Sequence, residues 1–289
     1  LEANTTASNN TAVGHGSLSA NTTGASNVAL GSYALDANTT AANNVGIGLN
    51  ALGGATTGGD NVAIGTNSLL TNSTGASNVS VGTYALNANT SSNNTAVGYA
   101  ALTTNTTGTQ NTAVGANALD ANTQGIYNTA IGYESLGSTT TGSYNIGLGR
   151  DAKSSSATVS NQCTLGDSNI NNLRCNDTSI SSLSDSRDKT DVIDSPYGLD
   201  FINTVRPVQF LWDTRDGNAK DGSTRIGFLA QELLAATDGN NAVLDLVLDD
   251  NPNKLEAKYG NLLPIAIQAI QELSAQVEAL TARIETLEG

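Results

Sequence analysis

The sequence is short of the residues that most often carry chemistry or cross-links. In 289 residues it has no methionine, one tryptophan, one histidine and two cysteines, and aromatic residues make up 4% of the chain. Cys163 and Cys175 alone cannot form the disulfide framework of a small secreted domain, so we expect two buried free thiols rather than a bridge or a metal pair. His15 has no second histidine to act with and is expected on the surface. The sequence therefore predicts no metal and no cofactor.

Basic residues are also scarce. Lys and Arg number 12 against 26 Asp and Glu, which gives a net charge of −14. Binding to nucleic acid needs clustered Lys and Arg, so nucleic acid is excluded as a partner. No apolar run approaches the length that crosses a bilayer, and we expect no membrane insertion. The first 150 residues hold five acids with no recurring pair. Because glycoside hydrolysis needs paired carboxylates, we assign no activity on polysaccharides.

What the chain has instead is a repeat built on glycine. Ten glycines recur from Gly14 to Gly166 at a step of 17, which is kept in eight of the nine intervals and falls to 16 between Gly82 and Gly98. An aliphatic residue precedes each glycine and a small residue precedes that one; Asn stands four positions before nine of them, and Leu four positions after the first eight. A fixed period of this kind indicates stacked structural repeats. The glycines are Gly14, Gly31, Gly48, Gly65, Gly82, Gly98, Gly115, Gly132, Gly149 and Gly166.

Residues 1–166 are predicted to form a parallel β-roll or β-solenoid rod. Asn, Thr, Ser and Gly are poor helix formers, whereas short β-branched stretches between such residues are typical of strands. One repeat cannot bury enough surface alone, so we expect its aliphatic residue and its leucine to join buried ladders with neighbouring repeats. The shortened interval falls in a polar loop, where it spares the buried positions. Low-complexity disorder does not explain an aliphatic residue at the same place ten times.

The character of the sequence changes after the repeat. Residues 167–183 are predicted to be a connector, and residues 184–289 an α+β domain that ends in a long coiled-coil helix over 261–289. Ile or Val alternating with Leu along the seam of a simple coil favours two strands, so the helix alone argues for a dimer. The seam positions, at steps of three and four, are Leu263, Ala266, Ile270, Leu273, Val277, Leu280, Ile284 and Leu287.

Four motifs stand in order in the C-terminal region: SDSRDKTDV from Ser184, FINTVRPVQFLWD from Phe201, GFLAQEL from Gly227 and YGNLLPIAIQAIQELSAQVEAL from Tyr259. Together they resemble the intramolecular chaperone of phage tail spikes and fibres, first known from endosialidase tailspikes. The resemblance implies a domain that trimerises the fibre it follows, helps it to fold and then cuts itself off. The N-terminal repeats are similar, more weakly, to the head repeats of trimeric adhesins. On these grounds we expect a homotrimer despite the dimer preference of the coil.

The resemblance also implies a Ser–Lys dyad. Carried over by motif, the nucleophile is Ser184, the base is Lys189, and the bond that is cut joins Leu183 to Ser184. Asp185 and Arg187 are expected to hold the strand geometry, and Glu232 is a candidate to assist Lys189. Short Ser…Lys spacings are abundant, so the dyad depends on the surrounding motifs, and some domains of this kind keep the chaperone role without cutting.

The leading hypothesis is a structural tail fibre or tailspike protein of a phage virion, which attaches to a host receptor of carbohydrate or protein. The chain opens without a methionine and inside a partial repeat, so we expect a fragment whose missing N-terminal region binds other tail proteins. The alternative is a bacterial trimeric surface adhesin with a non-cleaving C-terminal domain, whose repeats bind matrix or ice. A regular threonine array suited to ice is interrupted at Ala55–Thr56 and at Thr123–Gln124.

Overall fold

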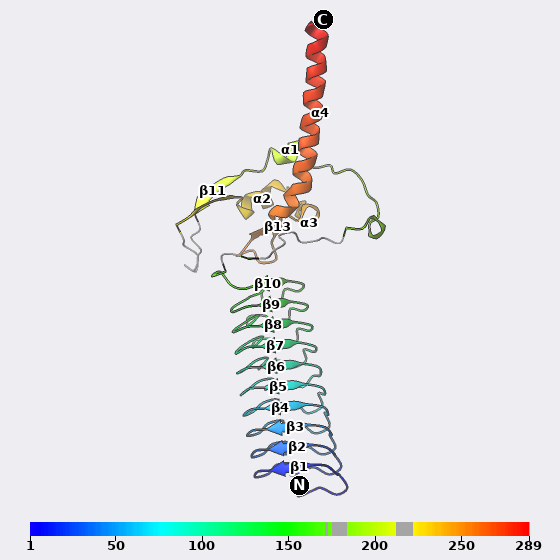
Figure 1. The fold of residues 1–289 in the computed structure, drawn as a ribbon, viewed down its shortest axis with the longest axis vertical. Helices are drawn as coiled ribbons and strands as arrows, with labels where there is room; N and C mark the ends of the chain where they lie inside the picture. The colour runs from blue at the N-terminus through cyan, green and yellow to red at the C-terminus, as the bar shows by residue number, and fades with distance from the viewer. Residues whose placement is uncertain (171–172, 175–183, 212–221, 289) are drawn as a thin grey trace. The chain divides into compact units, whose positions relative to one another are not determined.

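The computed structural model describes residues 1–170, 173–174, 184–211 and 222–288, which divide into two compact units, Leu1–Ile170 and Asn171–Gly289. In the first unit ten short strands form one parallel sheet in chain order (Figure 1). The strands are β1 (Thr11–Val13), β2 (Val28–Leu30), β3 (Val45–Ile47), β4 (Val62–Ile64), β5 (Val79–Val81), β6 (Thr95–Val97), β7 (Thr112–Val114), β8 (Thr129–Ile131), β9 (Ile146–Leu148) and β10 (Cys163–Leu165). The predicted parallel β-solenoid is confirmed.

Every strand pairs with the strand of the next coil. Val62 lies opposite Val79 and Thr112 opposite Thr129, so each residue meets its counterpart one full repeat later. The step from β5 to β6 spans the shortened repeat, and there Val81 still pairs with Val97. The missing residue is thus taken from the loop, and the pairing on either side is unchanged.

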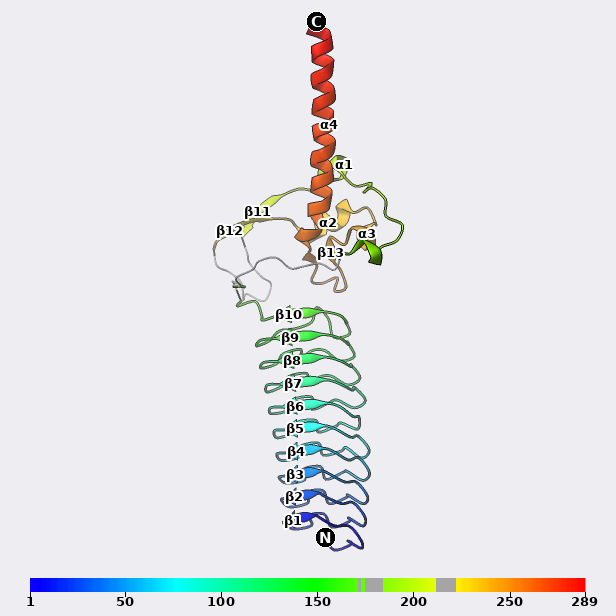
Figure 2. The ribbon, with the colours of Figure 1, turned by 45° about the vertical axis from the view of Figure 1, so that its right-hand side comes forward.

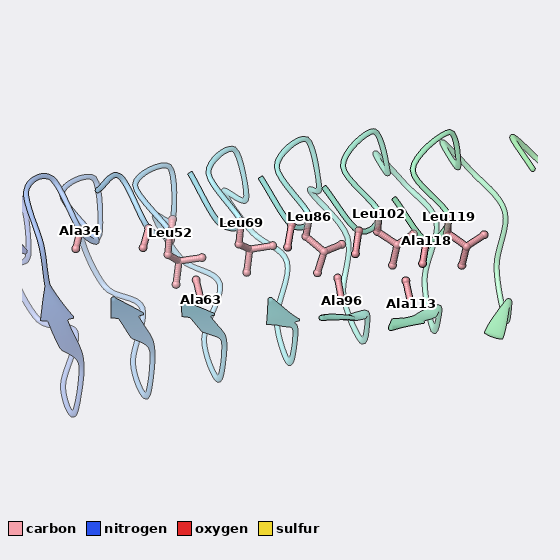
Figure 3. Packing of buried hydrophobic residues seen from close by; sticks show 14 of the residues in the cluster. Ala34, Leu52, Ala63, Leu69, Leu86, Ala96, Leu102, Ala113, Ala118 and Leu119 are labelled. Atoms are coloured by element: carbon pink, nitrogen blue, oxygen red, sulfur yellow. The ribbon is translucent and has the colours of Figure 1, made fainter. Parts of the chain in front are cut away.

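The interior of the solenoid holds one leucine per coil and small residues beside and opposite it, such as Ala51 before Leu52 and Ala63 in β4. The leucine four positions after each glycine, from Leu18 to Leu136, is 0–1% exposed, and the middle residue of the strand faces it from the opposite wall (Figure 3). Each of these leucines has a positive φ, for example 55° at Leu52. The left-handed conformation costs about 1–2 kcal/mol, and complete burial of the side chain returns about 2–3 kcal/mol. The buried leucine ladder is confirmed.

The second predicted ladder, made of the aliphatic residues before the glycines, lies on the outer face of the strands. The aliphatic residue before each glycine is not buried: eight of the ten are exposed, with Val13 at 56% and Ile131 at 45%, and Ile47 and Val81 are half-buried. Side chains alternate along a strand, so the small middle residue points inward and the first and third residues point outward. We call the first and third residues of β1–β10 the outer stripe. Our expectation that these aliphatic residues are buried is wrong for the single chain.

The interior also holds a continuous ladder of asparagine. The Oδ1 of Asn27 accepts the backbone N–H of Asn44 at 2.9 Å, and its Nδ2 donates to the carbonyl of Ala41 at 2.9 Å. The same pair of bonds recurs from coil to coil; Asn128, for example, accepts from the N–H of Asn145. These amides are fully buried, and a buried amide is costly unless it is bonded. The asparagine that precedes each strand therefore ties one coil to the next.

A second asparagine ladder runs through the Asn-Thr-Thr turns and is incomplete. Asn38 Nδ2 donates to Asn21 Oδ1 at 2.8 Å, but the next coil has Ala55 in place of Asn. Within the described part of the chain the buried Oδ1 of Asn38 has no hydrogen-bond partner, and neither do those of Asn72 and Asn122. In this place the solenoid leaves polar atoms unsatisfied because a repeat departs from the pattern.

The second unit is a small α+β body that ends in one long helix. It contains the 3₁₀ helices η1 (Ser186–Asp188) and η2 (Tyr259–Asn261), the helices α1 (Leu199–Ile202), α2 (Ala230–Ala236), α3 (Asn241–Leu244) and α4 (Leu262–Glu288), and the strand pairs β11 (Val208–Leu211) with β12 (Thr224–Gly227) and β13 (Val247–Leu248) with β14 (Glu256–Ala257). Leu233, Leu246, Val247, Leu262 and Ile265 form its core. Figure 2 shows α1 beside α4. The predicted α+β region and terminal helix are confirmed.

The large apolar residues of the α4 seam are exposed along the helix, from Leu263 at 64% through Val277 at 54% to Leu287 at 78%. The residues that α4 buries against the domain, among them Ile265 and Ala269, lie outside the seam. A helix with a long apolar seam in water needs a partner helix. No described helix is both long and apolar enough to cross a bilayer.

The cysteine prediction needs a correction. Cys163 begins β10 in the outer stripe and is an exposed free thiol, because its place in the strand directs its side chain outward. Cys175 lies outside the described residues, as does Trp212.

The glycine column predicts a position that cannot carry a side chain. Gly98 has φ +139°, and a Cβ there would lie 2.5 Å from the carbonyl oxygen of Gly115 in the next coil. Gly98→Ala should lower the free energy of unfolding by more than about 2 kcal/mol, measured by urea denaturation. Gly53→Ala is the matched control, since other coils carry Asp, Leu or Asn at that place, and should change stability by less than about 0.5 kcal/mol. Equal effects of the two substitutions would contradict this account.

The gap in the second asparagine ladder predicts a stabilising substitution. In Ala55→Asn the new amide can donate to Asn38 Oδ1 and accept from Asn72 Nδ2, so the free energy of unfolding should rise by about 1 kcal/mol. Ala63→Asn is the control, because Ala63 faces the leucines, and it should destabilise by about 2 kcal/mol. Urea denaturation of the parent and the two variants measures these changes in the free energy of unfolding. An Ala55→Asn protein that is no more stable than the parent would show that the missing amide does not lower the stability of the solenoid.

Candidate active site

Ser184 and Lys189 meet through their side chains. The amino group of Lys189 donates a hydrogen bond to Ser184 Oγ at 2.6 Å. Both residues are exposed in the single chain. A hydroxyl and an amine at this distance can exchange a proton directly, which is the geometry that an activated serine nucleophile requires.

A short 3₁₀ turn makes this contact. Asp185 caps η1 by accepting the N–H of Arg187 at 2.9 Å, and the Arg187 guanidinium also bonds both oxygens of that carboxylate, with Nε at 3.0 and 3.1 Å. The N–H of Lys189 then donates to the carbonyl of Ser186 at 3.3 Å. The chain is thereby reversed between Ser184 and Lys189. Asp185 and Arg187 hold a turn, not the strand we expected.

The charge of the Asp185 carboxylate is balanced within this turn. The hydrogen bonds from Arg187 hold the pKa of Asp185 below its usual value. The carboxylate is therefore an anion bound to arginine and not to the neighbouring lysine. Leu183 lies outside the described residues, so the geometry of the Leu183–Ser184 bond is not part of the structure.

Glu232 has a different partner from the expected one. Its carboxylate forms an ion pair with Arg206, whose Nε donates to Glu232 Oε2 at 3.0 Å, and this contact raises the pKa of Arg206. The structure thus places Glu232 against Arg206 rather than Lys189. The sequence did not single out Arg206, although it stands within one of the quoted motifs.

Three of the four motifs meet in one body. Besides the Arg206–Glu232 pair, the N–H of Phe228 donates to the Tyr259 hydroxyl at 3.2 Å, and the two rings pack edge to face at 5.3 Å. FINTVRPVQF, GFLAQEL and YGNLLP are therefore joined by tertiary contacts. Helix α4 adds Glu272, whose carboxylate accepts the N–H of Leu199 at 2.7 Å.

Comparison with known protein families agrees with the motifs. Residues 184–244 match the family model described as the chaperone of endosialidase. The C-terminal part of this chain is a chaperone-of-endosialidase domain. Domains of this family are intramolecular, self-cleaving chaperones. They are typically associated with trimeric assembly. Such a domain implies a phage tail-fibre-type protein. A search of curated proteins and one of solved structures gave no significant match. Among the described residues no group of three or more His, Cys, Asp or Glu is placed to hold a metal ion.

The contact between Glu272 and Leu199 predicts a pH dependence inside the chaperone domain. The hydrogen bond from Leu199, with one from Gln268, lowers the pKa of Glu272. A lowered pKa means that the contact is complete above the pKa of the unfolded chain and is lost as the pH falls through the folded-state value. Protection of the Leu199 amide from hydrogen exchange should therefore be constant above about pH 5 and fall below about pH 4.

Glu272→Gln keeps an acceptor but removes the titrating group, so its Leu199 amide should show no such step. The Asn44 amide, bonded to Asn27 Oδ1 in the solenoid, is the internal control for intrinsic exchange. The same acid step in parent and variant would exclude Glu272 as its source.

Proposed function

We propose that this chain is a fibre protein for host attachment, built as a homotrimer, whose chaperone domain directs folding and then releases itself. In this proposal residues 1–166 form the fibre, 167–183 the connector and 184–289 the domain that leaves. The observation that carries it is the 2.6 Å contact between Lys189 Nζ and Ser184 Oγ at the first residue of the family match.

The chemistry follows from the position of the hydroxyl next to the bond that is cut. Ser184 Oγ attacks the Leu183 carbonyl carbon through a five-membered ring, and Lys189 takes the hydroxyl proton. The C–N bond of the tetrahedral intermediate breaks as the Ser184 nitrogen receives that proton, which leaves the Leu183 acyl group as an ester on Oγ. Water then hydrolyses the ester to a Leu183 carboxylate and a free Ser184. Nucleophile and bond belong to one residue pair, so proximity supplies much of the rate.

Lys189 must be neutral to act as the base. An ammonium could not accept the hydroxyl proton. The partner of Asp185 matters here, because this carboxylate is bonded to Arg187 and not to the lysine. Asp185 and Arg187 act as positioning residues: they close the turn and leave the amine with the hydroxyl as its partner.

Assembly of several copies is supported by the exposed seam of α4, and the number three by the assembly typical of the family. The alternative of an ice-binding adhesin is disfavoured by the threonines themselves. The first threonine of each turn donates to a carbonyl in the next coil, as Thr22 does to Thr39 at 3.0 Å and Thr39 to Thr56 at 3.1 Å. The hydroxyls of this column are therefore engaged between coils.

Self-cleavage is tested by the intact mass of freshly expressed chains. The parent should give two fragments that meet at Leu183–Ser184, and Ser184→Ala should give one full-length chain. Lys189→Met should also stay full length, with a loss of rate of at least about 100-fold. Ser186→Ala, two residues away in the same turn, is the matched control and should be cut like the parent.

Full-length chain in the parent would reject the cut and leave a trimerisation domain that does not process itself. Cleavage in Ser184→Ala would reject the dyad. Circular dichroism of each uncut variant is the control that its fold is retained.

A further inference from the structure

The outer stripe is an apolar surface that runs the full length of the solenoid. Its ten third-position residues are all Val, Ile or Leu, and its first-position residues are Val, Ile, Thr or Cys. Leu30 is 47% exposed and Leu148 38%, although each has stacked neighbours on both sides. Scattered exposed aliphatic residues are ordinary, but a continuous apolar surface of this size marks an interaction site.

The stripe contains no charged residue in twenty positions, in a chain with a net charge of −14. Its two columns expose on the order of 1,000 Å², compared with the roughly 800 Å² that each partner buries in a standard interface. Uncharged, flat and apolar, it is the part of the solenoid that can be desolvated at least cost.

The periodicity of the stripe favours a copy of the same chain as its occupant. Aliphatic side chains recur at each strand of a parallel sheet, about 4.8 Å apart, and a partner that fits all ten coils must present the same spacing. A second copy in parallel register does so. The exposed seam of α4 also needs partner helices, and parallel copies of the chain cover both surfaces in one assembly.

We propose that the outer stripe is the contact between copies in the fibre, with the strands of three solenoids facing a common axis. The inference rests on the proposed function and deepens it. If the chaperone domain leaves, the α4 seam leaves with it, and the fibre must then be held by an interface of its own. The stripe supplies that interface, and in this register Thr95 of one copy lies near Thr95 of the others, and Thr112 near Thr112.

Cross-linking of single cysteines tests the proposal in the full-length chain. The background carries Ser184→Ala, Cys163→Ser and Cys175→Ser, so that no cut occurs and no native thiol reacts. Thr95→Cys and Thr112→Cys place one thiol in the stripe, Thr107→Cys places one in an exposed turn, and Val277→Cys places one in the α4 seam. A short bis-maleimide and a denaturing gel give the readout. In a trimer one linker joins two of three thiols, so about two thirds of the chains should appear as dimers.

We expect the two stripe variants and the Val277→Cys variant to reach that yield and Thr107→Cys to stay below a tenth of it. Cross-linking through Val277→Cys without the stripe would overturn this inference and leave the trimer of the proposed function intact. No cross-linking at any position would overturn both, whatever the intact mass says about cleavage. If every chain of the stripe variants appeared as a cross-linked dimer, the fibre would contain two copies of the chain and not three.

Discussion

The stacking of one coil directly on the next constrains every other feature of the solenoid. Backbone groups bond between coils, as the N–H of Gly31 does to the carbonyl of Val13 at 2.8 Å. At that spacing the glycine column has no room for a Cβ, and the interior between the walls holds one leucine and a few small residues in each coil. Because so little apolar surface fits inside, asparagine side chains fill the rest of the interior and bond the coils together. The remaining aliphatic residues have no place but the outside.

The sequence predicts the repeat, its parallel strands and the leucine ladder, because these depend on spacing and on propensity. Our prediction did not identify which side of such a short strand faces inward. The information was present in the small residue at the middle of each strand, since alternation puts that residue opposite to both of its neighbours. An aliphatic residue next to a glycine suggests a core position, and here the narrow interior overrides that preference. Cys163 is exposed for the same reason as Val13 and Ile131.

In the candidate site, contacts between residues close together in the chain could be predicted from the sequence, and contacts between distant residues could not. Ser184, Asp185, Arg187 and Lys189 lie close together in the chain, and a capped 3₁₀ turn follows from their order. The partner of Glu232 is far away in the chain and is set by where α2 lies relative to the segment between α1 and β11. A motif can identify both Arg206 and Glu232 as belonging to one family pattern, but only the folded domain shows that they neutralise each other. The exposed dyad, in turn, shows that the turn alone provides proximity without excluding water.

A solenoid whose coils contact only their neighbours can begin to fold at any coil and propagate in either direction. For a single chain this freedom is harmless, but copies that start at different coils would meet out of register along a stripe whose positions look alike. A C-terminal domain that gathers the copies through the α4 seam gives them one common starting point. Once the stripes are paired over ten coils, a slip by one coil must break every contact at once, so the barrier to dissociation grows with length. On the proposed function the domain is then no longer needed, and its loss makes the assembly irreversible, which is the condition for kinetic rather than equilibrium stability.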